Sequence, residues 1–71
     1  MNEPQSRDQT RVLTAVYEFG PLTAERIGYA IDMRPETVQR VLEELRRGFL
    51  VRRGTGGWCA MGAWSPYEVA A

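Results

Sequence analysis

The clearest pattern in this chain is PETVQRVLEELRR over residues 35–47, followed by Gly48. Its apolar side chains recur at i, i+3, i+4 and i+7, the spacing of one buried helix face: Val38, Val41, Leu42 and Leu45. Pro35 suits the first position of a helix, and Gly48 suits its end. We therefore predict a helix over residues 35–47 that packs this face into a core.

A helix is also predicted over residues 7–19. Ser6 and Gln9 have the spacing of a capping box, in which the serine hydroxyl accepts from a backbone N–H and the glutamine reaches back. Gly20-Pro21 is expected to end this helix, with the glycine in a left-handed conformation and the proline after it.

Another helix is predicted over residues 24–31, with Thr23 as its N-cap. Gly28 lies within it, and we expect the missing side chain to let two helices cross closely. A three-residue turn then leads to the helix over 35–47, which is the layout of a helix-turn-helix.

The periodicity changes after Gly48. Phe49-Leu50-Val51 and Trp58-Cys59-Ala60-Met61 are short runs of strand-forming residues, with Arg52-Arg53-Gly54-Thr55-Gly56-Gly57 between them. Two short strands around a glycine-rich turn predict a β-hairpin. The expected fold is mainly α with a small β-hairpin: a three-helix bundle with a C-terminal wing over residues 6–62. Residues 1–5 are predicted to be a disordered N-terminus, and residues 63–71 a C-terminal tail.

Composition argues against several classes of site. The 71 residues include no histidine, no lysine and one cysteine, Cys59. A structural zinc site needs about four Cys or His ligands, a Ser-His-Asp triad needs histidine, and a Walker loop needs lysine. Glu43 and Glu44 point about 100° apart on a helix, so they do not form an acid–base pair. We expect no enzyme, no cofactor and no metal site.

The chain also lacks the marks of export. It has no basic region followed by an apolar stretch, and no apolar run of the roughly 20 residues that span a bilayer. One unpaired cysteine fits a reducing compartment. The expectation is a cytoplasmic protein without a membrane segment.

Charge is separated along the chain, although the formal net charge is zero. Residues 34–53 carry six arginines and three glutamates, a net charge of +3, and the remainder carries three arginines and six acidic residues, a net charge of −3. This separation favours a nucleic-acid-binding face on the helix over 35–47 and on the hairpin. Three net charges predict only weak non-specific binding at physiological salt.

The chain contains LTAERI at 22–27, TVQRVLEEL at 37–45 and GFLVRR at 48–53. Together these segments resemble the DNA-binding domain of winged-helix transcription regulators, over about residues 11–62. The likeness is closest to the IclR type, with Gly57-Trp58 and Gly62 at the wing, and more distant to the MarR type. The resemblance implies a recognition helix in the major groove, a wing on the DNA backbone and dimers on paired half-sites.

The chain departs from this family in two respects. Arg34 stands where such regulators often have Ser or Thr before the proline, so a cation that can contact phosphate replaces the hydroxyl cap. IclR-type regulators also carry a large effector-binding domain after the wing, whereas this sequence stops at Ala71. We therefore expect no small-molecule effector domain.

The outer face of the helix over 35–47 has two interpretations. As a recognition surface, Arg40 would bind guanine O6 and N7, and Gln39 would bind adenine N6 and N7. As a solvated ridge, side chains of opposite charge would pair at about 0.2–0.5 kcal/mol per pair: Glu36, Arg40, Glu43 and Arg47. We favour DNA contact and predict the following contact residues: Thr23, Arg34, Glu36, Thr37, Gln39, Arg40, Arg47, Arg53 and Thr55.

The wing is open to the same two interpretations. Strand alternation sends Arg52 and Arg53 to opposite faces, and Arg53, next to the turn, is the better candidate for DNA contact. Alternatively, the wing is an ordinary glycine hairpin whose charges discourage edge-to-edge pairing. Trp58 is expected in the core rather than as a base-stacking platform, and Cys59 as a buried or half-buried small hydrophobe.

The favoured function is a small transcriptional regulator that binds double-stranded DNA without catalysis, by occlusion or recruitment. One unit reads only a few base pairs, so a dimer or a larger assembly is expected. The alternative is a winged-helix protein-interaction module that does not bind DNA. Its partner surface, or a homodimer contact, would lie around Trp64 and Tyr67 in the tail.

Overall fold

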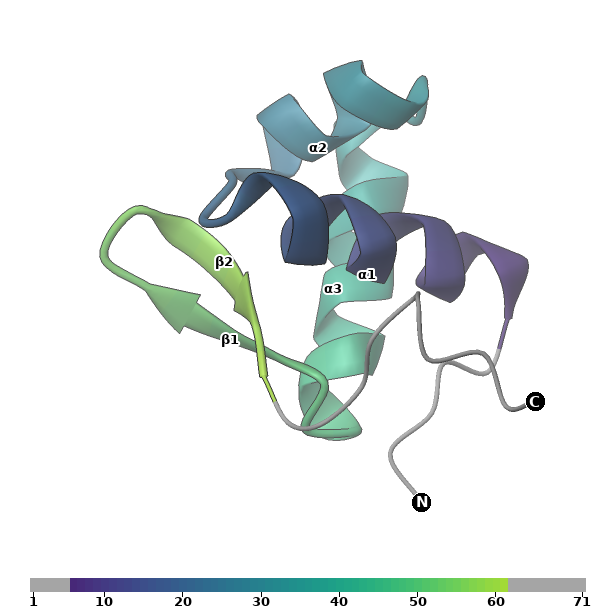
Figure 1. Ribbon diagram of the computed structural model, residues 1–71. Coiled ribbons are helices and arrows are strands. Elements are labelled where there is room, and N and C mark those ends of the chain that lie inside the picture. Colours follow the sequence, from purple (N-terminus) through teal and green to yellow (C-terminus); the bar gives the residue numbers. More distant parts are fainter. Residues whose placement is uncertain (1–5, 62–71) are drawn as a thin grey trace, which may run out of the picture.

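The computed structural model describes residues 6–61 and contains three helices followed by two strands. The helices are α1 (Arg7–Phe19), α2 (Ala24–Ile31) and α3 (Pro35–Arg47), and the strands are β1 (Val51–Gly54) and β2 (Gly57–Ala60) (Figure 1). The mainly α fold with a small hairpin is confirmed, and the three helices have the predicted bounds. The predictions for residues 1–5 and 63–71, and for Gly62, lie outside the described residues.

The predicted hydroxyl caps, Ser6 for α1 and Thr23 for α2, are confirmed, while the return contact from the Gln9 side chain to Ser6 stays a prediction. The Gln9 N–H donates to Ser6 Oγ over 3.2 Å, and the Arg26 N–H donates to Thr23 Oγ1 over 3.2 Å. The side chain of Gln9 also links two helices, because its Nε2 donates to Glu44 Oε1 at 3.0 Å. Gln9, whose backbone N–H donates to the cap of α1, therefore also holds α1 against α3 through its side chain.

The start of α3 follows from its proline. Pro35 occupies the first turn, and Arg34 precedes it with extended backbone and no capping hydrogen bond from its side chain. Proline fixes φ near its helical value and has no N–H to satisfy, so this helix begins without a hydroxyl cap.

The helices end at the predicted residues, but the backbone conformation that ends α1 differs from the predicted one. Gly20 has φ 76° but ψ −155°, so it lies outside the left-handed helical region in which we expected it. Among residues 6–61, the non-glycine residues with a positive φ are Asp32, with φ 58° after α2, and Phe49, with φ 60° after α3. Gly48 keeps φ −87°. The chain after α3 turns at Phe49, where the N–H of the next residue, Leu50, donates back to Leu45 O at 2.9 Å.

The core contains the apolar faces of all three helices and the start of the hairpin. The predicted stripe of α3 is buried, with Val38 and Leu42 fully so. Trp58, only 3% exposed, lies in the same core, which confirms its predicted place. Cys59 is half-buried, as predicted.

Gly28 is required by the turn rather than by a helix crossing. A Cβ at this position would lie 2.4 Å from the carbonyl oxygen of Met33, in the turn, and 3.5 Å from Val38 Cγ2. The prediction of a close approach is confirmed, but the main obstacle is backbone that follows α2.

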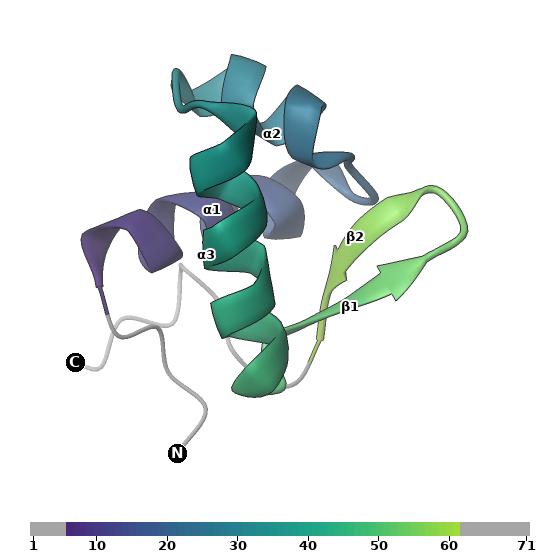
Figure 2. The ribbon, with the colours of Figure 1, turned by 180° about the vertical axis from the view of Figure 1, so that it is seen from behind.

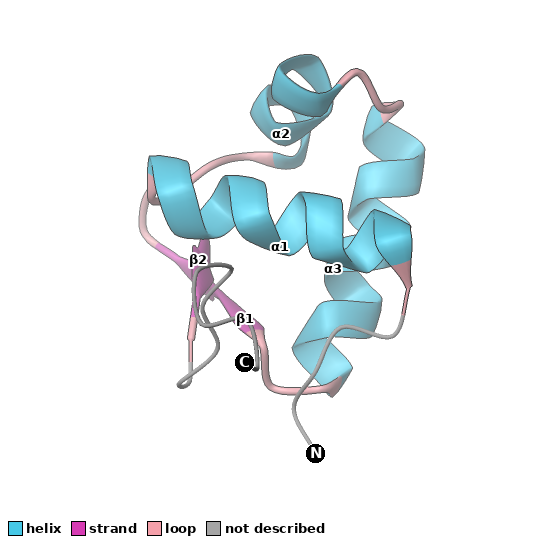
Figure 3. Ribbon diagram, turned by 45° about the vertical axis from the view of Figure 1, so that its right-hand side comes forward, coloured by secondary structure: helices cyan, strands magenta, loops and turns pink. Residues whose placement is uncertain are grey.

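The hairpin is antiparallel, and its register pairs Arg52 with Cys59 and Arg53 with Trp58. We expected its first strand to include residues 49–51, but β1 begins at Val51. The left-handed φ of Phe49 is incompatible with a strand, which explains the later start. Figure 3 shows the two strands together beside the C-terminal end of α1.

Leu22, in the loop before α2, anchors this hairpin. Its N–H donates to Trp58 O at 3.2 Å, and the Trp58 N–H donates to Leu22 O at 2.7 Å. Gly57 makes this approach possible, because its φ is 128° and a Cβ there would lie 2.5 Å from the Leu22 carbonyl group. The hairpin is therefore attached by its backbone to the loop that leads into the helix-turn-helix.

Candidate nucleic-acid interface

The exposed face of α3 forms one half of the candidate site. Its buried stripe faces the core, so the opposite face is open to solvent. Figure 2 shows α3 in front of α1, with the hairpin at its side. Five predicted contact residues lie on this helix, Thr37 half-buried and the others exposed: Glu36, Thr37, Gln39, Arg40 and Arg47.

The ion pairs on this face differ from the predicted ridge. Glu43 Oε1 pairs with Arg46 Nε at 3.0 Å, and Gln39 Nε2 donates to Glu43 Oε2 at 3.2 Å. Residues three or four apart on a helix are neighbours, so Glu43 has several partners within reach and takes Arg46. Within residues 6–61, Arg40 and Arg47 form no ion pair.

These contacts have two consequences for DNA recognition. The charge of Glu43 is largely offset by Arg46, which reduces its repulsion of phosphate. One N–H of the Gln39 amide is engaged by Glu43, which restrains the orientation of the amide, while its second N–H and its Oε1 stay available for adenine.

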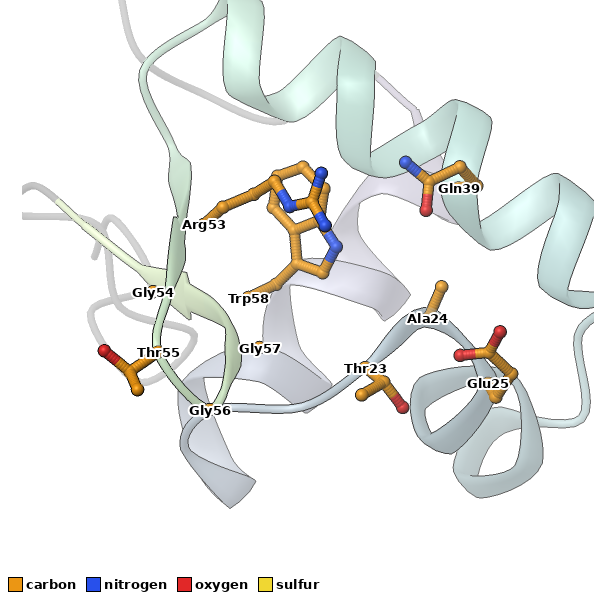
Figure 4. A pocket seen from close by; sticks show the side chains of 10 residues that line it. All are labelled: Thr23, Ala24, Glu25, Gln39, Arg53, Gly54, Thr55, Gly56, Gly57 and Trp58. Carbon is orange, nitrogen blue, oxygen red and sulfur yellow. The ribbon is translucent and has the colours of Figure 1, made fainter.

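A groove joins α3 to the hairpin and to the N-terminus of α2 (Figure 4). It brings together four of the predicted residues, from the start of α2, from α3 and from the hairpin: Thr23, Gln39, Arg53 and Thr55. Trp58 lies at its floor, and three glycines of the hairpin form much of one wall. Glu25, also in this groove, is an acidic residue that the sequence reasoning did not assign to the site.

Arg53 is positioned by Trp58. The two residues are cross-strand partners, and Arg53 Cζ lies 5.5 Å from the centroid of the indole ring. Figure 4 shows the guanidinium group over the ring, on the side of the groove that faces Gln39. At an exposed site such a cation–π contact contributes about 0.5–1 kcal/mol. Sequence reasoning missed this contact, although alternation across a two-residue turn places Arg53 opposite Trp58.

Arg52 lies on the other face of the hairpin, opposite Cys59, so the predicted divergence of the two arginines is confirmed. Arg34 lies apart from the groove. It lines a separate hollow at the turn between α2 and α3, together with Tyr29 and Pro35. The nine predicted residues therefore do not form a single cluster: the groove collects four, the outer side of α3 carries others, and Arg34 lies at the start of that helix.

Residues 6–61 contain neither a cluster of metal ligands nor a helix that could span a membrane. No three His, Cys, Asp or Glu side chains in this part of the chain gather closely enough to hold a metal ion. None of its helices has the length and apolar character needed to cross a membrane.

No protein family, no curated protein and no solved structure matches this chain. The arrangement of helices and hairpin is compatible with a winged helix, while the likeness to IclR-type regulators stays a prediction from the sequence.

Proposed function

We propose that this protein binds double-stranded DNA, with α3 in the major groove and the hairpin on the backbone or in the minor groove, and so acts as a small transcriptional regulator. The observation that carries the proposal is the placement of α3 beside the hairpin. Arg40 and Arg47 are exposed on α3 without an ion pair in residues 6–61, and Arg53 lies in the adjoining groove. A 13-residue helix is about 20 Å long, and the major groove admits a helix.

The residues have different roles in this proposal. Arg40 reads guanine through O6 and N7, and Glu36 accepts from cytosine N4 where it meets a base. Arg53 binds phosphate or enters the minor groove, starting from its place over Trp58. The remaining predicted residues contact the edges of the same stretch of duplex: Thr23, Arg34, Thr37, Gln39, Arg47 and Thr55.

The proposed activity needs more than one copy. Because one unit reads only a few base pairs, useful specificity requires a dimer or a larger assembly. The unpaired Cys59 fits a reducing compartment, so we place the activity in the cytoplasm. The chain acts by occupying DNA and recruiting or excluding other proteins, without catalysis.

Fluorescence anisotropy with a labelled mixed-sequence duplex, titrated across salt, tests the proposal. We expect micromolar binding that weakens steeply with salt, and weakens further in Arg40→Ala and in Arg53→Ala. Arg7→Ala is the matched control, because Arg7 is exposed and is the first residue of α1, whose N-terminal end lies far from the hairpin (Figure 1). Absence of binding at low salt, or equal loss in all three variants, would contradict DNA binding by α3 and the hairpin.

A protein-interaction module is the second candidate, and one observation favours it. Tyr29 on α2 is 93% exposed, an unusual position for a large aromatic side chain on a surface without a partner. This function predicts a flat DNA titration in every variant. The tail residues Trp64 and Tyr67, which sequence reasoning assigned to such a partner, lie outside the described residues.

A further inference from the structure

Three polar side chains on the exposed face of α3 are linked in a row: Gln39, Glu43 and Arg46. Gln39 Nε2 donates to Glu43 Oε2 at 3.2 Å, and Arg46 Nε donates to Glu43 Oε1 at 3.0 Å. The spacings of four and three residues place the three side chains on one side of the helix. Each oxygen of the Glu43 carboxylate therefore has its own partner, and Glu43 is held from both sides.

The Glu43 carboxylate determines which end of the Gln39 amide faces it. A carboxylate accepts hydrogen bonds and donates none, whereas an amide has a donating nitrogen and an accepting oxygen. If the amide turned over, its Oε1 would face Glu43 Oε2, and two acceptors repel each other. A hydrogen bond to an ionised acceptor is about twice as strong as a neutral one, which strengthens this preference. The nitrogen of the Gln39 amide is thus held toward Glu43, and its oxygen away from it.

The rest of the Gln39 amide is open to a ligand. Gln39 lines the groove between α3 and the hairpin (Figure 4). Within residues 6–61 its Oε1 accepts no hydrogen bond, and its second N–H donates none. One donor and one acceptor therefore lie side by side on this side chain, in an order that Glu43 fixes.

The order of donor and acceptor matters in a major groove. Adenine presents an acceptor, N7, beside a donor, the N6 amino group, and these match the donor and the acceptor of an amide. A T·A pair in place of A·T presents the same groups in the reverse order, and guanine presents two acceptors, N7 and O6. An amide that is free to turn over fits both orientations of the A·T pair, whereas an amide with a fixed orientation fits one of them.

We propose that Glu43 is a positioning residue, which holds the Gln39 amide in the orientation that reads adenine on one strand of the duplex. Arg46 in turn holds Glu43 in place. This role rests on the proposed binding of double-stranded DNA by α3, and it adds that a tight binding site contains an A·T pair whose orientation matters. Glu43 acts through Gln39 and does not itself contact the base.

The row of side chains contributes little to the stability of α3. The side chains of Glu43 and Arg46 are 37% and 56% exposed, and the median contribution of such surface pairs to folding is small. The buried stripe on the opposite face holds this helix in the fold. Substitutions of Glu43 should therefore leave the fold intact, so a role in recognition can be separated from a role in folding.

Anisotropy titrations of the full chain, on a duplex selected from a random pool for tight binding, test the proposal. Each A·T pair of this duplex is reversed to T·A in turn, and the position at which the reversal has no effect on Gln39→Ala is the one that Gln39 reads. At that position we expect the wild type to prefer A·T by about tenfold or more. We expect Glu43→Gln to lose most of this preference, because an amide in place of the carboxylate both accepts and donates, so Gln39 can turn over.

Glu44→Gln is the matched control. It removes the same charge one residue along the helix, and it keeps an oxygen that accepts from Gln9 Nε2, which bonds to Glu44 Oε1 at 3.0 Å. The loss of one negative charge should tighten binding to all duplexes alike in both variants. Only Glu43→Gln should also lose the preference between A·T and T·A.

A measurement without DNA tests the orientation of the amide directly. Nitrogen-15 relaxation of the Gln39 side-chain amide should show restricted motion in the wild type and free motion in Glu43→Ala, with native far-UV circular dichroism in both. Equal mobility of this amide in the two proteins would overturn the proposal.

The DNA titrations separate a failure of this role from a failure of the proposed function. A Glu43→Gln variant that keeps the full preference for A·T would overturn the role of Glu43, and so would a Gln39→Ala variant that loses no preference at any position. DNA binding by α3 would stand in both cases. Absence of DNA binding by the wild type at low salt would instead refute the proposed function, and this role of Glu43 with it.

Discussion

α3 and the hairpin share the candidate interface, but the structure holds them in place by different means. α3 is fixed by side chains, because its four apolar residues are almost fully buried. The hairpin also buries side chains, those of Val51 and Trp58, but it has in addition a backbone attachment, the two hydrogen bonds between Leu22 and Trp58. The comparison teaches that both halves of the interface depend on core packing, and that the hairpin depends besides on a close backbone approach that only glycine permits.

The largest expected effect is the loss of stability when the buried packing of α3 is reduced. Leu42 is fully buried, and Leu42→Ala removes packing worth about 2–5 kcal/mol. The single core of a domain this small rarely supplies more than about 3–5 kcal/mol. We therefore expect Leu42→Ala to be largely unfolded at 37 °C by circular dichroism, with Arg47→Ala, exposed on the same helix, close to wild type. A cooperative melt of Leu42→Ala within a few degrees of the wild type would contradict this role of α3.

Gly57→Ala tests the backbone attachment of the hairpin to Leu22. The added Cβ would meet the Leu22 carbonyl group at 2.5 Å, and φ 128° is unfavourable for alanine, so we expect a loss of about 1–3 kcal/mol. In a Trp64→Phe background, the emission of Trp58 should shift to longer wavelength while helical circular dichroism is retained. Gly48→Ala is the matched control, because its Cβ has no neighbour closer than 3.6 Å. Unchanged emission and stability in Gly57→Ala would show that the hairpin does not depend on this approach.

The same comparison extends to DNA recognition under the proposed function. On a duplex selected for tight binding, Arg40→Ala should lose about 1–3 kcal/mol of discrimination against a single-base change, because it contacts a base. Arg53→Ala should weaken binding to all duplexes alike and lower the salt slope by about 1, because it contacts phosphate. Anisotropy titrations on paired duplexes measure both quantities. A loss of discrimination in Arg53→Ala alone would reverse the two assignments.

Most of the fold could be predicted from local pattern. The bounds of all three helices followed from apolar periodicity, from the caps at Ser6 and Thr23, and from Pro35. These signals are local, because each depends on residues within one or two turns. The burial of Trp58 followed equally from its place after the turn.

The parts that sequence reasoning missed depend on distant or nearly equivalent contacts. The bridge between Leu22 and Trp58 joins residues far apart in sequence, so no local pattern indicates it. Glu43 pairs with Arg46 rather than with Arg40 or Arg47. The sequence could not predict this choice, because the free energies of such pairs on a helix differ by only a few tenths of a kcal/mol. Of the predicted site, the groove brings together Gln39 of α3 and the predicted residues at the start of α2 and in the hairpin. Arg34 lies outside the groove, because the turn between α2 and α3 sets its position.

The smallest expected effect concerns Phe49, where α3 passes into β1. Its φ of 60° is costly for any residue with a Cβ, and the side chain is 66% exposed, so little packing compensates. Phe49→Gly and Phe49→Ala both remove the ring, but only glycine adopts this conformation without strain. We expect Phe49→Gly to be more stable than Phe49→Ala by about 1 kcal/mol in urea unfolding. Equal stability of the two would mean that Phe49 is extended and that β1 begins earlier, as the run Phe49-Leu50-Val51 indicates. The hairpin would then continue directly from α3, without a separate closing turn.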